Sequence, residues 1–194
     1  MNLCVIVLTT DLNAVHKPPK FIPKVCYKVG EKTMIEICLE NIALLNPSRI
    51  ILMVSKYDIF YINKLIKHAS YSKLISYCIF DNQNNERPYT ISLAKNCYSG
   101  KNILVVPGNS PLLTSKIMYR MISENRNVKI TNHLFYLEKE CVSEIDYISD
   151  YNTGDEDFIT AKEKIQIESV SQYEEIKLLF EKKSKYKFLH KRDT

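Results

Sequence analysis

The sequence predicts an α/β domain with a mainly parallel, doubly wound sheet. First, apolar runs such as LCVIVL at residues 3–8 are typical of strands buried on both faces of a sheet. Second, four such runs alternate with segments whose apolar residues recur at helical spacing. Third, strand–helix alternation forms parallel sheets, and right-handed crossovers place the helices on both faces.

The first two thirds of the chain follow this alternation. After the strand at 3–8 comes a proline-containing loop, and a helix is then predicted over 33–46. Thr33 and Glu36 fit a capping box at its start, and Pro47 ends it. The next predicted elements are a strand at 49–54, a helix at 57–69, a strand at 73–80, a helix at 89–98 entered through Pro88, a strand at 102–106 and a helix at 115–125.

The last third carries a weaker pattern. The predicted elements are one strand over 128–137, with an antiparallel orientation as an option, a short strand over 164–169, and a helix over 171–183 with Ser171 and Glu174 as a capping box. Residues 139–163 are acidic and match neither period. No internal repeat is present, so we expect one domain over residues 1–183 and a basic tail over 184–194.

Charge and composition do not favour a nucleic-acid or membrane protein. The formal net charge of +5 is spread along the chain and is densest in the tail KKSKYKFLHKR, which we interpret as a solvated terminus. No RNP-like motif, zinc-finger spacing or long basic helix accompanies it. The apolar start MNLCVIVL lacks a basic flank and is too short to span a membrane.

The six cysteines show neither C-x-x-C spacing nor a compact disulfide framework. Several lie within apolar strand or helix patterns, as buried reduced thiols do. We therefore expect a cytoplasmic protein. The oligomeric state is left open, with a homo-oligomer among the options.

In a parallel sheet, ligands bind beyond the carboxyl ends of the strands. Three loops of this chain are expected to converge there: the loop after residue 8, the loop after residue 80, and PGNSPLLT at 107–114. The start of the last helix is a further candidate for this edge.

Three segments resemble the nucleotide-sugar pyrophosphorylases. PKVCYKVGEKTMIEICLENI at 23–42 is similar to their Pro-Lys segment and the helix that follows, and ILVVPGNSPLLT at 103–114 is similar to their GDxPLLT corner. IQIESVSQYEEIKLL at 165–179 resembles their closing strand and helix. The nearest resemblance is to the uridylyltransferase domain of bacterial N-acetylglucosamine-1-phosphate uridyltransferases.

The resemblance implies a single Rossmann-like α/β/α nucleotidyltransferase domain of the GT-A type. Its implied reaction is uridylyl transfer from UTP to a sugar 1-phosphate, N-acetylglucosamine 1-phosphate or a relative, with Mg²⁺ as cofactor. Two alternatives stay open. One is a catalytically degenerate protein that binds a nucleotide or sugar phosphate or serves a structural role on the same fold. The other is a cytidylyltransferase, which VSKYDIFYINKLI at 54–66 would also suit.

The family's first loop is glycine-rich and binds phosphate through backbone N–H groups, whereas here it reads LTTDLNAVH without glycine. Thr9, Thr10 and Lys17 are the nucleotide-binding candidates in or next to this loop. Lys24 matches the family's Pro-Lys lysine and is the implied catalytic residue, because a lysine there contacts phosphate in the family.

The family reads its base through a Gly-Thr-Gly element after the third strand, and that element is missing here. Gln83 and Asn84 are candidates for the pyrimidine edge, and Arg87 is a candidate for a phosphate. Gly108 completes the implied nucleotide-binding set. An asparagine-rich loop is also a common turn, and that reading stays open.

The implied metal ligands are Asn109 and Glu168. Asn109 stands where the family has an aspartate, and Glu168 stands where the family has an asparagine. Mg²⁺ prefers charged oxygen ligands, so we expect the carboxylate to have moved from one side of the ion to the other. The interval of 168 − 109 = 59 residues is shorter than the family's sugar-binding stretch.

Overall fold

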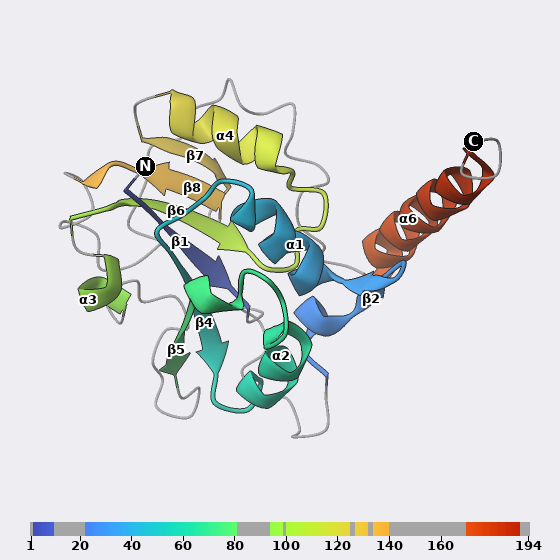
Figure 1. The fold of residues 1–194 in the computed structure, drawn as a ribbon, viewed down its shortest axis with the longest axis horizontal. Helices are drawn as coiled ribbons and strands as arrows, with labels where there is room; N and C mark the ends of the chain where they lie inside the picture. Colours follow the sequence, from blue (N-terminus) through green and yellow to red (C-terminus); the bar gives the residue numbers. More distant parts are fainter. Residues whose placement is uncertain are drawn as a thin grey trace.

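The computed structural model describes residues 2–9, 22–80, 94–98, 100–124, 127–131, 134–139 and 170–190. They form an α/β fold around a six-stranded sheet of order β5-β4-β1-β6-β8-β7 (Figure 1). The strands are β1 (Leu3–Leu8), β4 (Arg49–Ser55), β5 (Ile75–Phe80), β6 (Asn102–Pro107), β7 (Val128–Thr131) and β8 (Leu134–Leu137). The predicted mainly parallel sheet is confirmed, because β5, β4, β1 and β6 pair in parallel, and β8, antiparallel to both β6 and β7, is the one reversed strand among the described strands of this sheet.

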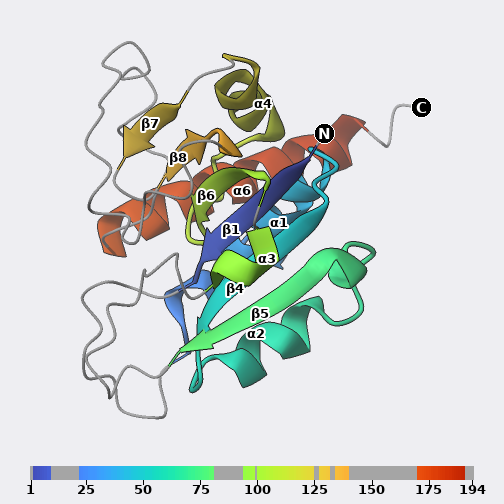
Figure 2. The same cartoon turned by 90° about the vertical axis from the view of Figure 1, so that its left-hand side faces the viewer.

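Helices cover both faces of the sheet, as the crossover rule requires. The helices are α1 (Met34–Ala43), α2 (Ile59–Ile66), α3 (Lys95–Tyr98), α4 (Ser115–Ser123) and α6 (Val170–His190). Side chains of α1, α2 and α4 pack on one face of the sheet, and Tyr98 of α3 packs on the other. The turned view in Figure 2 shows α3 and α1 on opposite sides of β1.

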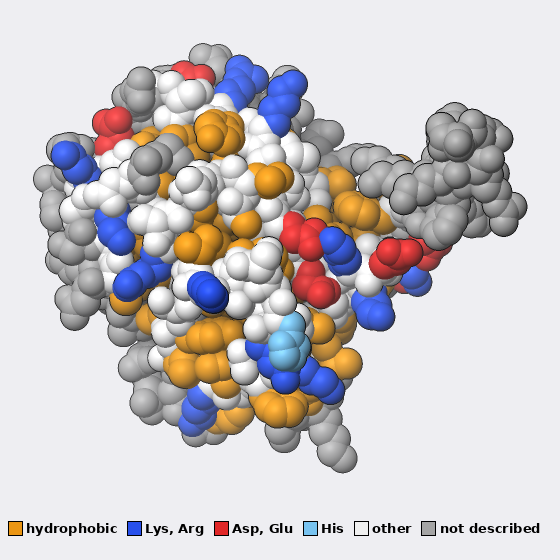
Figure 3. Space-filling view, viewed as in Figure 1, with side chains coloured by type: hydrophobic (Ala, Val, Ile, Leu, Met, Phe, Trp, Pro, Cys, Tyr) orange, Lys and Arg blue, Asp and Glu red, His pale blue; other side chains and the backbone are white. Residues whose placement is uncertain are grey.

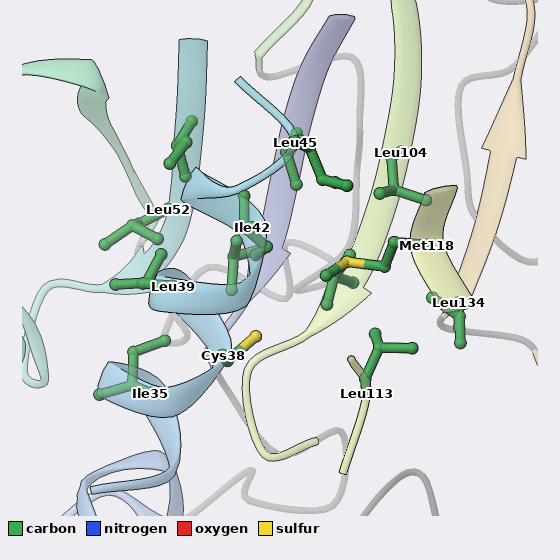
Figure 4. Close-up of a cluster of buried hydrophobic side chains, with 14 of the residues drawn as sticks. Ile35, Cys38, Leu39, Ile42, Leu45, Leu52, Leu104, Leu113, Met118 and Leu134 are labelled. Atoms are coloured by element: carbon green, nitrogen blue, oxygen red, sulfur yellow. The ribbon is translucent and has the colours of Figure 1, made fainter. Parts of the chain in front are cut away.

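The alternation of side chains along β1 explains this two-sided core. Leu3, Val5 and Val7 belong to the cluster under α1, α2 and α4, whereas Cys4 and Ile6 belong to the cluster on the opposite face. All five side chains are fully buried, so the apolar run at 3–8 has no solvent-facing position. Figure 4 shows the larger cluster, in which side chains of α1 meet side chains of β4, β6 and α4.

The predicted capping box is confirmed, and the first helix is shorter than predicted. The Thr33 side chain accepts from the Glu36 N–H, and a Glu36 oxygen accepts from the Thr33 N–H at 2.8 Å. Helix α1 ends at Ala43, because Asn46 has a left-handed φ of 52° that stops the helix before Pro47. Helix α2 is likewise shorter than the predicted 57–69.

The single strand predicted over 128–137 is wrong. The chain forms two antiparallel strands there, β7 and β8, and β8 pairs with β6. The polar sequence TNH at 131–133 separates two apolar groups and breaks the run. A second feature was not predicted at all: β2 (Lys28–Val29) and β3 (Lys32–Thr33) form a hairpin whose turn residue Gly30 has a φ of 73°.

Described side chains in the first half of helix α6 pack on this hairpin. Ile176 is 3% exposed against Val29 and Met34, with Tyr173 and Phe180 beside them. The helix was predicted to end at 183 but continues to His190, and its far half extends away from the sheet (Figure 1). The strand predicted at 164–169 and residues 81–93 lie outside the described residues.

Described charged side chains of both signs are interspersed on the face shown in Figure 3, over the helices and the hairpin. Lys32 and Glu40 form one ion pair there, at 2.6 Å. Within the described ranges, no helix has the length and hydropathy needed to cross a bilayer.

Candidate active site

The carboxyl ends of three neighbouring strands are tied together by short hydrogen bonds. The Gly108 N–H, just after β6, donates to the Leu8 carbonyl of β1 at 2.8 Å. The Thr9 N–H and hydroxyl both donate to the Met53 carbonyl of β4, at 3.3 and 2.7 Å. The ends of β4, β1 and β6 therefore form one edge, which is where a parallel sheet binds ligands.

Thr9 was predicted to bind the nucleotide, and the structure places it at this edge. Its side chain is 3% exposed, and its hydroxyl proton is used in the bond to Met53. The residue therefore joins β1 to β4, and only its hydroxyl lone pairs are left over from that bond.

Gly108 was also predicted to bind the nucleotide, and it lies where the surrounding atoms leave little room for a side chain. A Cβ atom built there would be 3.1 Å from Ile35 Cδ1, 3.1 Å from the Leu8 carbonyl oxygen and 3.3 Å from Val25 Cγ1. A glycine lets β6 end directly against β1 and α1. The Cys38 thiol, on α1, donates to the Pro107 carbonyl at 3.8 Å and holds the same corner from the helix side.

Lys24 begins a 3-10 turn that reaches this corner. The turn is closed by hydrogen bonds from the Cys26 N–H to the Pro23 carbonyl at 2.8 Å and from the Tyr27 N–H to the Lys24 carbonyl at 2.9 Å. Val25, the next residue, is buried and packs where Gly108 would carry a side chain. The Val25 side chain thus holds the Lys24 turn beside Gly108.

One carboxylate near this turn, Asp58, was missed by the sequence reasoning. Burial, with the negative charges of Asp58 and Glu36 as smaller causes, raises the pKa of the Cys26 thiol to about 12. Glu36 is engaged in the capping box, whereas Asp58 follows β4 and precedes α2. The signal for Asp58 was its position directly after a buried strand, which places a carboxylate at the binding edge.

Asn109 lies at the corner as predicted, half-buried between Gly108 and Ser110. Its amide oxygen is a hard, uncharged ligand of the kind Mg²⁺ accepts. Among the residues described by the structure, no group of three or more His, Cys, Asp or Glu side chains could hold a metal ion.

The remaining candidate residues cannot be placed relative to this corner. Outside the described residues lie Thr10, Lys17, Gln83, Asn84, Arg87 and Glu168. Their roles stay predictions.

Ser110 carries an unsatisfied buried hydroxyl. Its side chain is 0% exposed, and its Oγ is the one buried side-chain polar atom of the described residues without a hydrogen-bond partner. We expect Ser110→Ala to raise the free energy of unfolding by about 1 kcal/mol, because it removes a desolvated group that gains no bond. Urea denaturation measures this change.

A matched control is Ser48→Ala, in which the hydroxyl lost is one that donates to the Leu3 carbonyl at 2.9 Å. This variant should lose stability by about 1 kcal/mol. If both serine variants are destabilised equally, the Ser110 hydroxyl has a bond that the structure does not show.

The fold is shared with solved structures of low sequence identity. A Bacillus anthracis protein described as a glucose-1-phosphate thymidylyltransferase, in complex with sucrose, has a TM-score of 0.61 and 10% identity over 92% of this chain and 95% of its own. The 4-diphosphocytidyl-2C-methyl-D-erythritol synthase of Anaerococcus prevotii has a TM-score of 0.63 and 12% identity over 93% and 98%. The Mycobacterium tuberculosis protein Rv0371C, in complex with manganese, has a TM-score of 0.59 and 10% identity over 90% and 97%.

No protein-family model matches the chain, and no curated protein matches it in sequence. The likeness is therefore one of fold: the chain has the α/β fold of these nucleotidyltransferases, matched over nearly their full length. The expected fold class is confirmed. The nearer resemblance to the uridylyltransferase domain is not singled out by these structures, which include thymidylyl and cytidylyl enzymes.

Proposed function

We propose that this protein is a nucleotidyltransferase that transfers a uridylyl group from UTP to a sugar 1-phosphate, with pyrophosphate as the leaving group. N-acetylglucosamine 1-phosphate or a relative is the proposed acceptor. The observation that carries the proposal is the packing of Val25, the residue after Lys24, beside Gly108, at the strand ends of a fold that nucleotidyltransferases share. A cation at this edge is what a triphosphate requires.

In the proposed reaction, a phosphate oxygen of the sugar phosphate attacks the α-phosphate of UTP, and the bond from the α-phosphate to pyrophosphate breaks. Lys24 stabilises the negative charge that develops on the transferring group. Asn109 and Glu168 would hold Mg²⁺, which when bound supplies charge neutralisation for the phosphates. Thr10, Lys17 and Arg87 are proposed phosphate contacts, and Gln83 and Asn84 are proposed base contacts.

A cytidylyltransferase is the second candidate. The observation in its favour is the match to the 4-diphosphocytidyl-2C-methyl-D-erythritol synthase, of which 98% is covered. The same site chemistry would then act on CTP, and only the contacts to the base and to the acceptor would differ. The asparagine at position 109 favours the degenerate alternative, because an amide brings no charge to a metal ion.

Release of pyrophosphate tests the proposal. The purified protein with Mg²⁺ would be given UTP, CTP, TTP, GTP or ATP, each with and without N-acetylglucosamine 1-phosphate, and with Mn²⁺ in a parallel series. Acceptor-dependent release with UTP supports the uridylyl proposal. Thermal stabilisation by triphosphates without release under any pairing favours the binding protein, and the absence of both effects refutes the two together.

Exchange of charge between positions 109 and 168 gives a sharper test of the metal ligands. Glu168→Gln should lower turnover at least about 100-fold, because a unit charge beside the divalent ion is lost. Adding Asn109→Asp to this variant restores the carboxylate on the other side of the ion, so turnover should recover in part. Turnover that is unchanged in Glu168→Gln, measured as pyrophosphate release over a Mg²⁺ titration, would refute the exchanged-ligand arrangement.

A further inference from the structure

Helix α6 contacts the segment that follows the Lys24 turn through one tyrosine. The Tyr173 hydroxyl donates to the Lys28 carbonyl at 2.7 Å, across 145 residues of sequence. The Tyr173 ring also meets the Tyr27 ring edge to face, with centroids 5.8 Å apart and planes at 67°. A single side chain therefore contacts two consecutive residues, Tyr27 through its ring and Lys28 through its backbone carbonyl.

Tyr27 links the Lys24 turn to the rest of the fold. The Tyr27 N–H closes the turn on the Lys24 carbonyl at 2.9 Å, and the Tyr27 carbonyl accepts from the Met34 N–H of α1 at 3.0 Å. On the other side of Lys24 stands Pro23, whose ring fixes its own φ but supplies no N–H to a neighbour. The orientation of the turn thus depends on what holds residue 27.

The apolar contacts of α6 place Tyr173 firmly. Ile176 is buried against Val29 and Met34, and Phe180 Cβ lies 3.5 Å from where a side chain on Gly30 would begin. These contacts are one turn and two turns along from Tyr173, on the same face of the helix. Tyr173 is accordingly carried on a rigid element rather than on a loop.

We propose that Tyr173 is a positioning residue for Lys24: it holds Tyr27 and Lys28 in place, and through the Tyr27 N–H it fixes the turn that presents the lysine to the triphosphate. The role of Lys24 in this statement rests on the proposed function. The coupling of Tyr173 to the turn rests on the contacts above. These two parts are tested by different measurements.

The first measurement needs no nucleotide. In Tyr173→Phe the ring contact remains but the bond to Lys28 is lost, so the Tyr27 amide should exchange its hydrogen about two- to tenfold faster than in the wild type. Leu178→Ala is the matched control, because Leu178 lies on the same helix and is 55% exposed. It should leave the exchange of the Tyr27 amide unchanged. Equal exchange in the wild type and Tyr173→Phe would overturn the coupling.

The second measurement uses MgUTP and MgCTP in calorimetric titrations of the full chain. Tyr173→Phe should weaken binding of the better triphosphate about two- to tenfold, and Leu178→Ala should not. In a Lys24→Met background, the same Tyr173→Phe change should alter triphosphate affinity less than about twofold, because the lysine through which Tyr173 acts on the ligand is absent.

If Tyr173→Phe weakens triphosphate binding by the same factor in the wild type and in the Lys24→Met background, the positioning role is overturned and the proposed function stays intact. If the wild type binds neither triphosphate, the proposed function fails. The hydrogen-exchange result then decides whether Tyr173 governs the turn. Tyr173→Ala, which loses the ring contact as well, should show a larger effect than Tyr173→Phe in both measurements.

Discussion

Replacing Lys24 with methionine is expected to lower kcat/KM for nucleotidyl transfer by about 10²–10³-fold, the loss typical of a group that stabilises transition-state charge. Methionine keeps the apolar stem of the side chain, and Lys24 is half-buried, so the thermal midpoint should stay close to that of the wild type. Steady-state pyrophosphate release and a thermal denaturation scan measure the two quantities.

Lys28→Met is the matched control for this change. The Lys28 side chain is exposed on β2, and its carbonyl, which Tyr173 uses, is unaffected by the substitution. Lys28→Met removes the same charge four residues away along the chain. Any loss in this variant therefore measures how much the net charge of the protein alone contributes to attracting the triphosphate. Equal losses in both variants would show that Lys24 acts only through the overall field and has no specific contact.

Gly108→Val is expected to lower the free energy of unfolding by about 3 kcal/mol, at the upper end of what overpacking costs. The first side-chain atom alone would stand 3.1 Å from the Leu8 carbonyl oxygen, which is part of a paired strand and cannot rotate away. Two further methyl groups must displace Ile35 or Val25 as well. Because Val25 is next to Lys24, the substitution should also move the turn and weaken triphosphate binding.

Gly108→Ala supplies the graded comparison. It adds only the atom that makes the close contacts, so its loss of stability should fall between those of the wild type and Gly108→Val. Urea denaturation of the three proteins gives the series. If the valine variant is as stable as the wild type, the ends of β6 and β1 are not in the close contact described here.

The elements that the sequence predicted well are those whose burial is complete. The run at 3–8 is buried on both faces, so every position had to be apolar, and the capping box of Thr33 and Glu36 is a local pattern that needs no tertiary partner. The hairpin at 28–33 was missed, because its strands are two residues long and alternate too briefly to show a period. It is stabilised by α6, which lies far away in sequence.

The position of the candidate site in the fold could be predicted from the sequence, whereas the contacts made by its individual side chains could not. Parallel strands bring their carboxyl ends together, so the corner at 107–114 and the segment after residue 8 could be assigned to one edge. No local sequence pattern encodes the distances between separate elements. The hydrogen bond from the Thr9 hydroxyl to the Met53 carbonyl and the position of Asp58 near Cys26 both depend on such distances. The contact made by Tyr173 could not be predicted for the same reason, because its partner is a backbone carbonyl.

The thiol of Cys38 gives this corner an internal chemical reporter. It is fully buried, and burial raises its pKa to about 12, so at neutral pH it stays protonated. Alkylating reagents attack the thiolate, and they can reach this one only when α1 lifts from the end of β6. The rate at which Cys38 becomes labelled therefore measures how often α1 separates from the end of β6.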